Sequence, residues 1–271
     1  MQNNFTPAVL TIAGSDPYGG AGIQIDSKTI HAIGGYAFSV TTALAAQNSK
    51  GVAAVEICSP EMFKAQLETL LEDVKPDAVK IGMLANRKCI EILIDMIKQY
   101  ELKNIVLDTV LVSSSGKKLL DEDAIEIMIK KLFPLVDIIT PNIPEINTFL
   151  GSDYVGNEDE AEEITTAFMK LGVNSVLIKG GHSNNQKEAS DYLILKDLKV
   201  HTFITPRVNT THTHGTGCLL SSAIATNLAL GFNLTESIAK AKNFLYEKLQ
   251  RSATLNLNYK DETHERREPI F

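Results

Sequence analysis

Short apolar segments and helix-like segments alternate along most of this chain of 271 residues, and this alternation limits the folds open to it more than any other feature. A short apolar run that ends at a turn is typical of a buried strand, whereas apolar residues spaced three and four apart are typical of a helix. Strands that alternate with helices form a mostly parallel sheet covered by helices on both faces. The expected strands cover residues 9–13, 36–45, 78–84, 104–108, 136–140, 175–179, 191–195 and 200–205, the last two as an antiparallel-looking pair.

Several of the expected helices begin or end at recognisable caps. Ser59 precedes a proline, which fits the first turn of a helix, and Asn233 stands three residues before Glu236, the spacing of a capping box. Gly172 and Gly231 stand where C-terminal caps are expected. The expected helices cover about residues 23–33, 60–71, 89–99, 121–133, 158–171, 216–230 and 234–251.

The composition is that of one globular domain. Hydrophobic residues make up 44% of the chain, which is enough for a sizeable core, and no linker, repeat or low-complexity tract divides residues 1–271. The tail, from about residue 256 to residue 271, is highly charged, and we expect it to lie loosely on the surface. A net charge of −7 without any basic stretch argues against a general nucleic-acid binder.

The chain also lacks the features of a membrane or secreted protein. No apolar run approaches the length that spans a bilayer, and the N-terminus lacks the basic and apolar regions of a signal peptide. The three cysteines, Cys58, Cys89 and Cys218, are an odd number without metal-type spacing, so we expect reduced thiols and no zinc site. We therefore expect a cytoplasmic protein that does not bind membranes.

The segment from His212 to Cys218 is expected to form an anion-binding turn. Gly215 and Gly217 allow a tight turn and close approach to a ligand, and the helix that follows aims its unpaired N–H groups at that turn. Cys218 would lie in the first turn of this helix, where the helix dipole stabilises a thiolate. The alternative is an ordinary glycine-rich turn with a small buried cysteine.

A second glycine-rich stretch, from Gly14 to Gly22, follows the first expected strand. It lacks the lysine of a Walker loop and does not match the dinucleotide-binding fingerprint, so the residues leave open whether it binds a ligand or is only a tight turn. Polar residues also follow other expected strands, at the edge where α/β sheets collect ligands. These residues are Asp16, Gln47, Asp108, Asn142, Glu145 and Lys179.

Taken together, these stretches resemble the hydroxymethylpyrimidine and phosphomethylpyrimidine kinases of thiamine biosynthesis, members of the ribokinase-like superfamily. The resemblance runs from about residue 9 to residue 249, in the family's order and spacing. It rests on AGSD at 13–16, GGAGIQID at 19–26, TALAAQN at 42–48, VKIGML at 79–84, TPNIPE at 140–145, KGGH at 179–182 and HGTGC at 214–218.

The resemblance implies an ATP-dependent phosphotransferase. The acceptor would be the primary alcohol of 4-amino-5-hydroxymethyl-2-methylpyrimidine and then its monophosphate, which gives the diphosphate used to build thiamine. A three-layer α/β/α fold with a mostly parallel sheet, Mg²⁺ as a cofactor and a homodimer are implied in the same way.

The resemblance also points to a pyrimidine pocket. The carboxamide of Gln47 offers an acceptor and donors that match the 4-amino group and the adjacent ring nitrogen of an aminopyrimidine, although Gln47 could instead tie down a loop. Met83 and Val110 match positions that line this pocket in the family, and Ala21 and Asp26 match further pocket positions. Met83 and Val110 could equally be core residues, and Asp26 could be a first-turn acid favoured by the helix dipole.

Asn142 and Glu145 resemble the superfamily's Asn-x-x-Glu element, which helps hold Mg²⁺ and its waters near the phosphates. One glutamate with Asp108 is chemically sufficient for Mg²⁺, because this ion keeps several waters. The same residues also fit a capped helix start. Lys179 is placed to meet the ATP phosphates, with a solvated surface lysine as the alternative.

Cys218 occupies the place where sugar-kinase relatives carry the aspartate that takes the hydroxyl proton. We expect Cys218 to assist deprotonation, while the N–H groups of Gly215, Thr216, Gly217 and Cys218 stabilise the transferring phosphoryl group. No carboxylate partner for His212 or His214 is visible in the sequence, so we expect structural hydrogen bonds from both.

Some positions depart from the family's usual pattern, and two rival functions stay open. The departures are Tyr18 beside Pro17, Thr109, Ser114 and His212, of which Tyr18 could narrow the pocket mouth. The first rival is a pyridoxal kinase, in which methionine commonly matches Gln47 and cannot pair with an aminopyrimidine. The second is a ligand-binding protein without phosphoryl transfer, against which the intact set of Asn142, Glu145, Lys179 and the turn at 215–218 argues.

Overall fold

A nine-stranded sheet forms the centre of the computed structural model, which describes residues 6–112, 120–156, 160–182, 187–197, 199–252, 257, 259–260, 266 and 268–270. The strand order is β3-β2-β1-β4-β5-β6-β7-β8-β9, and neighbouring strands from β2 to β7 run parallel. These parallel strands are β1 (Ala8–Ser15), β2 (Tyr36–Asn48), β4 (Ala78–Ile81), β5 (Ile105–Leu107), β6 (Ile138–Ile139) and β7 (Ser175–Ile178). The antiparallel additions are β3 (Gly51–Ile57) at one edge and β8 (Glu188–Leu195) with β9 (Val200–Pro206) at the other.

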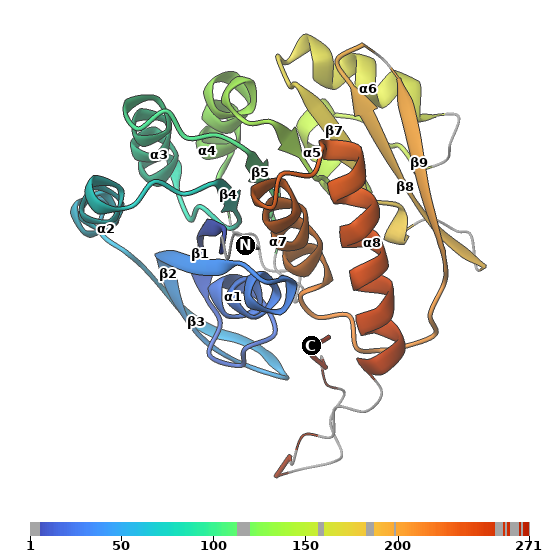
Figure 1. The fold of residues 1–271 in the computed structure, drawn as a ribbon, viewed down its shortest axis with the longest axis horizontal. Coiled ribbons are helices and arrows are strands. Elements are labelled where there is room, and N and C mark those ends of the chain that lie inside the picture. The colour runs from blue at the N-terminus through green and yellow to red at the C-terminus, as the bar shows by residue number, and fades with distance from the viewer. Residues whose placement is uncertain are drawn as a thin grey trace, which may run out of the picture.

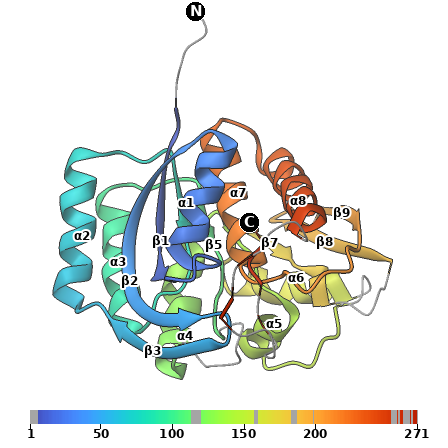
Figure 2. The ribbon, with the colours of Figure 1, turned by 90° about the horizontal axis from the view of Figure 1, so that it is seen from below.

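Helices cover both faces of this sheet (Figure 1). One face carries α2 (Pro60–Asp73), α3 (Arg87–Gln99), α4 (Glu122–Ile127), α5 (Ile143–Leu150) and α6 (Ala161–Lys170), which share one apolar core with the sheet. The opposite face carries α1 (Gly22–Ile33), α7 (Thr216–Ala229) and α8 (Leu234–Arg251), with a second core. The turned view in Figure 2 shows α2 and α3 on one side of the strands and α1, α7 and α8 on the other. The predicted three-layer α/β/α fold is therefore confirmed.

Alternating side chains of the parallel strands supply these two cores. In β1, Val9 joins the core under α1 and α7, whereas Leu10 joins the core on the opposite face, as the two-residue repeat of a strand requires. Thr11 and Lys80, which are register partners in β1 and β4, occupy buried positions where the alternation predicts apolar residues on the α7 face. A lysine at such a position needs a partner charge.

Most sequence predictions of elements hold, and the caps hold best. The Ser59 hydroxyl accepts from the Met62 N–H, and Asn233 with Glu236 forms a capping box. The expected helix over 121–133 is wrong in its second half, where α4 gives way to a π-helical turn (Met128–Leu132) and a 3₁₀ turn (Phe133–Leu135). Pro134 lacks an N–H, which explains why a regular α-helix ends ahead of it.

Strand β3 is absent from the sequence predictions. It pairs with β2 as an antiparallel hairpin, and its side chains stay exposed or half-buried. Because neither face of β3 is covered, its sequence lacks the apolar alternation by which a strand is recognised. Over the described ranges, no helix combines the length and the apolar character needed to cross a membrane.

The prediction of a loose C-terminal tail is wrong for the last residues that the structure describes. Ile270 is only 1% exposed and packs in a small cluster with Ile25 and Leu219. The backbone N–H of His214 donates to the carbonyl oxygen of Glu268 at 3.2 Å. An isoleucine near the end of an otherwise charged tail supplies the apolar anchor that holds this segment in place.

Candidate active site

Polar side chains gather where the parallel strands end, as the sequence predicts. Asp108 follows β5, Lys179 follows β7, and the N-terminus of α7 lies beside both. The Lys179 Nζ lies 2.9 Å from Asp108 Oδ1. A Cβ added to Gly217 would lie 3.4 Å from Asp108 Oδ2 and 3.5 Å from Lys179 Nζ. This edge of the sheet therefore joins a carboxylate, an ammonium group and a helix N-terminus.

The turn before α7 requires glycine. Gly215 is the N-cap of α7 with φ of 91°, and a Cβ at this position would lie 1.7 Å from the carbonyl oxygen of Gly20. The Thr216 N–H already donates to the carbonyl oxygen of Thr213 at 3.3 Å within the turn. Gly217 and Cys218 lie in the first turn of the helix, where N–H groups have no intrahelical acceptor. Their N–H groups can face an anion.

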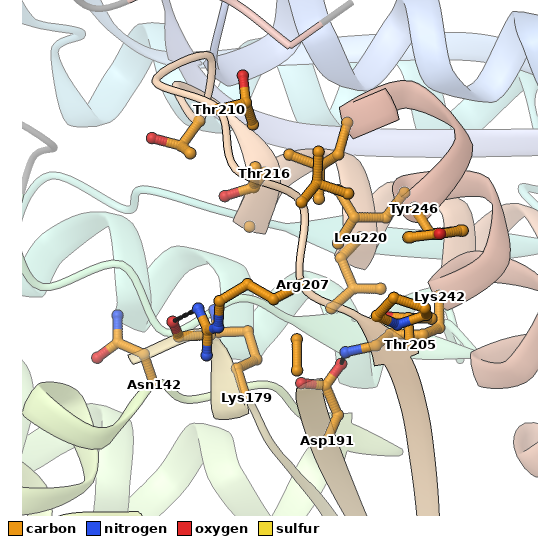
Figure 3. A pocket seen from close by; sticks show the side chains of 18 residues that line it. Asn142, Lys179, Asp191, Thr205, Arg207, Thr210, Thr216, Leu220, Lys242 and Tyr246 are labelled. Carbon is orange, nitrogen blue, oxygen red and sulfur yellow. Dashed lines mark hydrogen bonds and ion pairs between the residues drawn. The ribbon is translucent and has the colours of Figure 1, made fainter. Parts of the chain in front are cut away.

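A cavity of about 250 Å³ opens beside this turn (Figure 3). Lys179 and Asn142 line it together with Thr216 and Gly217, and the other wall is built from β8, β9 and α8. Within that wall, the Lys242 Nζ bonds Asp191 Oδ2 at 2.7 Å, and the guanidinium of Arg207 donates to the carbonyl oxygen of Gly181 at 3.0 Å. The cavity thus combines cationic groups with backbone N–H groups, a combination suited to phosphates.

Charge around Asp108 is balanced by lysine. Burial by itself would raise the pKa of Asp108, but the charges of Lys179 and Lys80 outweigh it and hold the pKa below its ordinary value. Burial works against the Lys179 ammonium, yet Asp108 and Glu145 raise its pKa. Thr140 and Ser221 also donate to the Asp108 carboxylate, at 3.3 and 3.4 Å. Both members of the pair are therefore charged at neutral pH.

Asn142 and Glu145 form the predicted capped helix start. The Asn142 side chain accepts from the Glu145 N–H, and Glu145 Oε2 accepts from the Asn142 N–H, both at 2.9 Å. The hydroxyl of Thr109, one of the departures from the family pattern, donates to the same oxygen at 2.9 Å. Burial and the nearby Asp108 raise the pKa of Glu145. The second role expected for Glu145, at a metal, stays a prediction.

Gln47 lies on the other side of the α7 turn, at the end of β2. Its Nε2 is 3.3 Å from Nε2 of His214, and the same imidazole nitrogen is 3.1 Å from Asp16 Oδ2. Asp16 also accepts from the N–H groups of Tyr18, Gly20 and Ala21 and so organises the glycine loop. The expectation that His214 lacks a carboxylate partner is wrong, because Asp16 is its partner. The sequence does not reveal this pair because the two residues are 198 positions apart.

The carboxylate of Asp16 is well stabilised in its ionised form. Burial would raise its pKa, but the hydrogen bond with His214 and the backbone N–H groups lower it below the ordinary value. Asp16 therefore serves as a fixed anionic anchor for the first glycine loop. No signal in the sequence separates this role from that of a turn-forming aspartate.

Three of the residues assigned to the pyrimidine pocket by resemblance remain partly exposed. Met83, Val110 and Ala21 are half-buried, so each keeps some accessible surface. The Met83 Cε lies only 2.9 Å from the place that a Cβ on Gly14 would take, so its thioether rests over that glycine. Their contact with a substrate stays a prediction.

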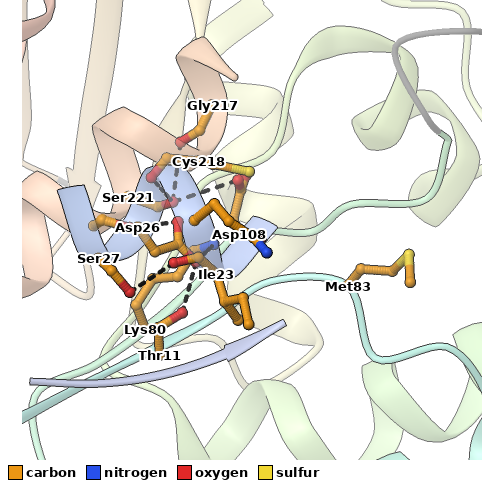
Figure 4. Close-up of polar contacts among 12 residues, drawn as sticks. Thr11, Ile23, Asp26, Ser27, Lys80, Met83, Asp108, Gly217, Cys218 and Ser221 are labelled. Atoms are coloured by element: carbon orange, nitrogen blue, oxygen red, sulfur yellow. Dashed lines mark hydrogen bonds and ion pairs between the residues drawn. The ribbon is translucent and has the colours of Figure 1, made fainter. Parts of the chain in front are cut away.

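Asp26 differs from these three, and the structure corrects the expectation that it lies on the pocket surface. Its side chain is fully buried and accepts from Thr11 at 2.6 Å, from Lys80 at 2.7 Å and from Ser222 at 2.7 Å. Figure 4 shows Asp26, Lys80 and Thr11 meeting close to Cys218 and Ser221. With both carboxylate oxygens engaged and no exposed surface, Asp26 holds α1, α7 and two strands together.

Lys80 is a buried charged residue beside the site to which the sequence interpretation assigns no role. Burial alone would lower its pKa, but the charge of Asp26, followed by Cys218 and Asp108, raises it above the ordinary value. A lysine within the apolar strand at 78–81 is the signal that could have found it, because an unpaired buried ammonium is not stable. Its ammonium charge lies beneath the α7 turn.

The structure also corrects the expected state of Cys218. Burial raises the pKa of this thiol, Lys80 and the Gly22 N–H lower it, and the carboxylates of Asp26 and Asp108 raise it, with a net value of about 11. The thiol is therefore protonated at neutral pH, not held as a thiolate by the helix dipole. Cys58, Cys89 and Cys218 are free, as predicted. Ser114 lies outside the described residues.

Comparison with known proteins identifies one family. A model of the phosphomethylpyrimidine kinase family matches residues 16–263. A hydroxymethylpyrimidine/phosphomethylpyrimidine kinase of Escherichia coli K12 is 40% identical over 250 residues, which cover 92% of this chain and 93% of that protein. The crystal structure of a phosphomethylpyrimidine kinase from Clostridium difficile 630 is 42% identical, with a TM-score of 0.78, and covers 89% of this chain and 99% of its own.

A pyridoxal kinase shares the same scaffold. The ADP complex of pyridoxal kinase from Bacillus subtilis is 32% identical with a TM-score of 0.86, and it covers 94% of this chain and 95% of its own. The backbone is thus closer to the pyridoxal kinase, whereas the sequence is closer to the pyrimidine kinases. Since fold alone does not set the substrate, the choice of acceptor depends on the side chains of the site.

Proposed function

The chain belongs to the phosphomethylpyrimidine kinase family, and from this premise we propose that it transfers a phosphoryl group from ATP to 4-amino-5-hydroxymethyl-2-methylpyrimidine and then to the monophosphate. The product is the pyrimidine diphosphate used in thiamine biosynthesis. The enzyme is a phosphotransferase, and the cavity lined by Lys179, Asn142 and Gly217 is the proposed site of the ATP phosphates.

A single observation supports this proposal best: the turn before α7 lies between the cavity and the Gln47 side chain. Thr216 and Gly217 line the cationic cavity, while His214, two residues before Thr216, contacts Gln47 and Asp16 on the other side. A phosphoryl group that passes from the cavity to an acceptor held by Gln47 must cross the N-terminus of α7. Preorganised N–H groups at that point stabilise the charge of the transferring group.

In the first proposed transfer, the oxygen of the acceptor hydroxyl forms a bond to the γ-phosphorus as the bond from that phosphorus to the β,γ-bridging oxygen breaks. In the second, a phosphate oxygen of the monophosphate forms the new bond in place of the hydroxyl oxygen. ADP leaves with the electron pair of the broken bond. Lys179 neutralises phosphate charge, and the N–H groups of Gly217 and Cys218 face the group in transit. The hydroxyl proton must also leave, but a loose transition state demands little from a base.

Base catalysis by Cys218 remains a proposal, and the raised pKa argues against a preformed thiolate. Cys218 can accept the proton only after it has lost its own proton. A Cys218→Ala variant that keeps wild-type turnover would restrict the role of this residue to its backbone N–H.

Mg²⁺ fits the donor chemistry of the site as a water-mediated partner. No cluster of three or more histidine, cysteine or acidic side chains suited to a metal occurs among the described residues, but Mg²⁺ bound with ATP needs only one or two protein carboxylates. Glu145 with Asn142 would hold its waters, and Asp108, which already accepts from Lys179, Thr140 and Ser221, would act through water. The ion would supply neutralisation of phosphate charge.

The pyrimidine is preferred to pyridoxal because of Gln47. Its carboxamide can accept from the 4-amino group and donate to the adjacent ring nitrogen, two hydrogen bonds that pyridoxal cannot make in the same way. The side chain is half-buried beside His214, which limits its rotamers. Loss of such a pair costs about 1–3 kcal/mol.

We further propose one domain over residues 1–271, a cytoplasmic location and a homodimer. The homodimer is supported by large apolar side chains left exposed around the β2–β3 hairpin and α2. They are Tyr36, Leu44, Ile57 and Met62. Burial of such side chains between two copies of the chain would remove apolar surface from water. Light scattering on the purified chain would test the homodimer, and a monomer at micromolar concentration would exclude it.

The decisive experiment is ADP release with three acceptors side by side: the hydroxymethylpyrimidine, its monophosphate and pyridoxal. We expect turnover of both pyrimidines and little of pyridoxal. Gln47→Ala should lower kcat/KM for the pyrimidines by about 5- to 150-fold and leave KM for ATP unchanged. Preference for pyridoxal, or an unchanged kcat/KM in Gln47→Ala, would reject the assignment of the acceptor.

A further inference from the structure

The end of the chain lies against the acceptor half of the site. Residues 266 and 268–270 follow the region matched by the family model, which ends at residue 263. Pro269 and Ile270 are buried, and Ile270 packs with Ile25 of α1 and Leu219 of α7. Figures 1 and 2 both show the C-terminus beside α1 and α7, far in the sequence from either.

The backbone of this segment contacts His214 directly. The His214 N–H donates to the carbonyl oxygen of Glu268 at 3.2 Å, and residues 214 and 269 form a parallel bridge. A Cβ on Gly20 would lie 2.4 Å from His214 Cδ2 and 3.0 Å from Pro269 Cβ. The segment, His214 and the first glycine loop therefore meet with no space between them.

Side chains extend the contact to both acceptor-side elements. The hydroxyl of Tyr259 donates to Glu268 Oε2 at 2.7 Å and is hydrogen-bonded by the hydroxyl of Tyr18 in the glycine loop. The guanidinium of Arg266 lies 3.8 Å over the Tyr259 ring, and its Nη1 is 3.4 Å from Ser49 Oγ, just past the end of β2. Gln47 stands two residues before Ser49.

We propose that residues 266 and 268–270 are a positioning element of the acceptor site, which holds His214 in place and, through it, Gln47 and Asp16. The proposal rests on the function proposed above. The imidazole of His214 lies between Gln47 Nε2, at 3.3 Å, and Asp16 Oδ2, at 3.1 Å, so a shift of its backbone moves the group that reads the pyrimidine. Tyr18, a departure from the family pattern, is linked to the same segment through Tyr259, whose hydroxyl donates to Glu268.

The test uses binding without turnover. Calorimetry would compare the full chain, a chain that ends at residue 265, and Ile270→Asp, which removes the apolar anchor. We expect the dissociation constant for the hydroxymethylpyrimidine to rise by about tenfold or more in both altered chains, since the site is no longer preorganised. The dissociation constant for ADP should stay within about threefold, because its cavity lies on the other side of the α7 turn.

Two controls separate positioning from a general loss of structure. Ile204→Asp places the same substitution on an exposed isoleucine of β9 and should bind both ligands like the unaltered chain. Ile270→Val keeps the anchor and should restore pyrimidine binding. In steady-state assays, KM for the pyrimidine should rise in Ile270→Asp more than kcat falls.

Each contrary outcome has a distinct meaning. Equal pyrimidine affinity in the full and shortened chains would overturn the positioning role and leave the proposed function standing. Equal losses for ADP and pyrimidine would reduce the segment to structural support, which also overturns it. A full chain that binds ADP but no pyrimidine would reject the proposed function, and the positioning role with it.

Discussion

Two lysine–aspartate pairs lie near the N-terminus of α7, and they differ in depth. In the Lys80–Asp26 pair both side chains are 0% exposed and 2.7 Å apart, whereas in the Lys179–Asp108 pair the lysine is 14% exposed and lines the cavity, at 2.9 Å. The first pair is closed to any ligand, and its partners are protein hydroxyls. The second keeps one face of its ammonium group available to a phosphate.

The difference in exposure shows that a lysine–aspartate pair can either hold elements of the fold together or present a charge to a cavity. A buried ion pair adds little net stability, but its disruption is costly because one charge is left without a partner. The Lys80–Asp26 pair therefore fixes the elements beneath the turn, while the Lys179–Asp108 pair presents a charge at the turn. Cys218 lies under the influence of both, since Lys80, Asp26 and Asp108 all affect its pKa.

The largest effect should come from breaking the closed pair. Lys80→Met leaves the Asp26 carboxylate buried without its cation, and we expect the free energy of unfolding in urea to fall by about 3–5 kcal/mol. The double variant Lys80→Met/Asp26→Asn should recover part of this loss, because no unpaired charge remains and the one amide oxygen still accepts from either Thr11 or Ser222, which bond different oxygens of Asp26. Stability within about 1 kcal/mol of the unaltered chain in Lys80→Met would contradict the structural role.

Breaking the open pair should affect turnover. Lys179→Met removes the charge that we propose faces the phosphates, and we expect kcat/KM for ATP to fall by about 10²- to 10³-fold. Lys199→Met, at a lysine exposed to solvent near the start of β9, is the matched control and should leave kcat/KM unchanged. Adding Asp108→Asn to Lys179→Met should restore stability but not turnover, and recovery of activity in that double variant would place the phosphates elsewhere.

The reactivity of the Cys218 thiol should depend on the charges of both lysine–aspartate pairs. In a chain with Cys58→Ser and Cys89→Ala, alkylation of Cys218 by iodoacetamide should rise about tenfold per pH unit from pH 7 to about pH 10, because the pKa of about 11 keeps the thiolate fraction small. Lys80→Met should move the profile to higher pH, and Asp108→Asn to lower pH. A plateau below about pH 9 would show that the thiolate is already formed.

The smallest effect concerns acid stability. Because the pKa of Asp108 is lowered in the folded state, its ionised form stabilises the fold at pH values above the unfolded pKa of about 3.9. This contribution is lost as the pH falls through the folded-state pKa. Urea unfolding at pH 5 and pH 3 should therefore show a shallower fall in stability for Asp108→Asn than for the unaltered chain. Equal slopes would mean that Asp108 contributes nothing in this range.

The sequence predicts the fold well because the information is local. Alternating apolar runs, a capping box at Asn142 and another at Asn233 depend on neighbours within a few residues, and a parallel sheet then follows from the order of the elements. Strand β3 escapes prediction because it contributes little to either core. The π-helical turn before Pro134 is not predicted because the apolar residues keep a helix-like spacing through it.

The candidate site is predicted only where its residues act through position on a strand end. Asp108, Lys179 and the α7 turn come together for that reason. The His214–Asp16 contact and the docking of Ile270 join residues that are about as far apart as the chain allows. Such contacts depend on how the helices and the sheet pack in the folded chain, and no local sequence pattern predicts them.

The two glycine loops touch without spare volume, since any side-chain carbon on Gly215 would collide with the Gly20 carbonyl oxygen at 1.7 Å. Neither loop can therefore move toward the other by the width of a methyl group unless the other moves away. A movement of one loop toward the other is therefore transmitted by direct contact of main chain on main chain. In a two-substrate enzyme, such a contact links the position of the first glycine loop to the geometry of the turn before α7.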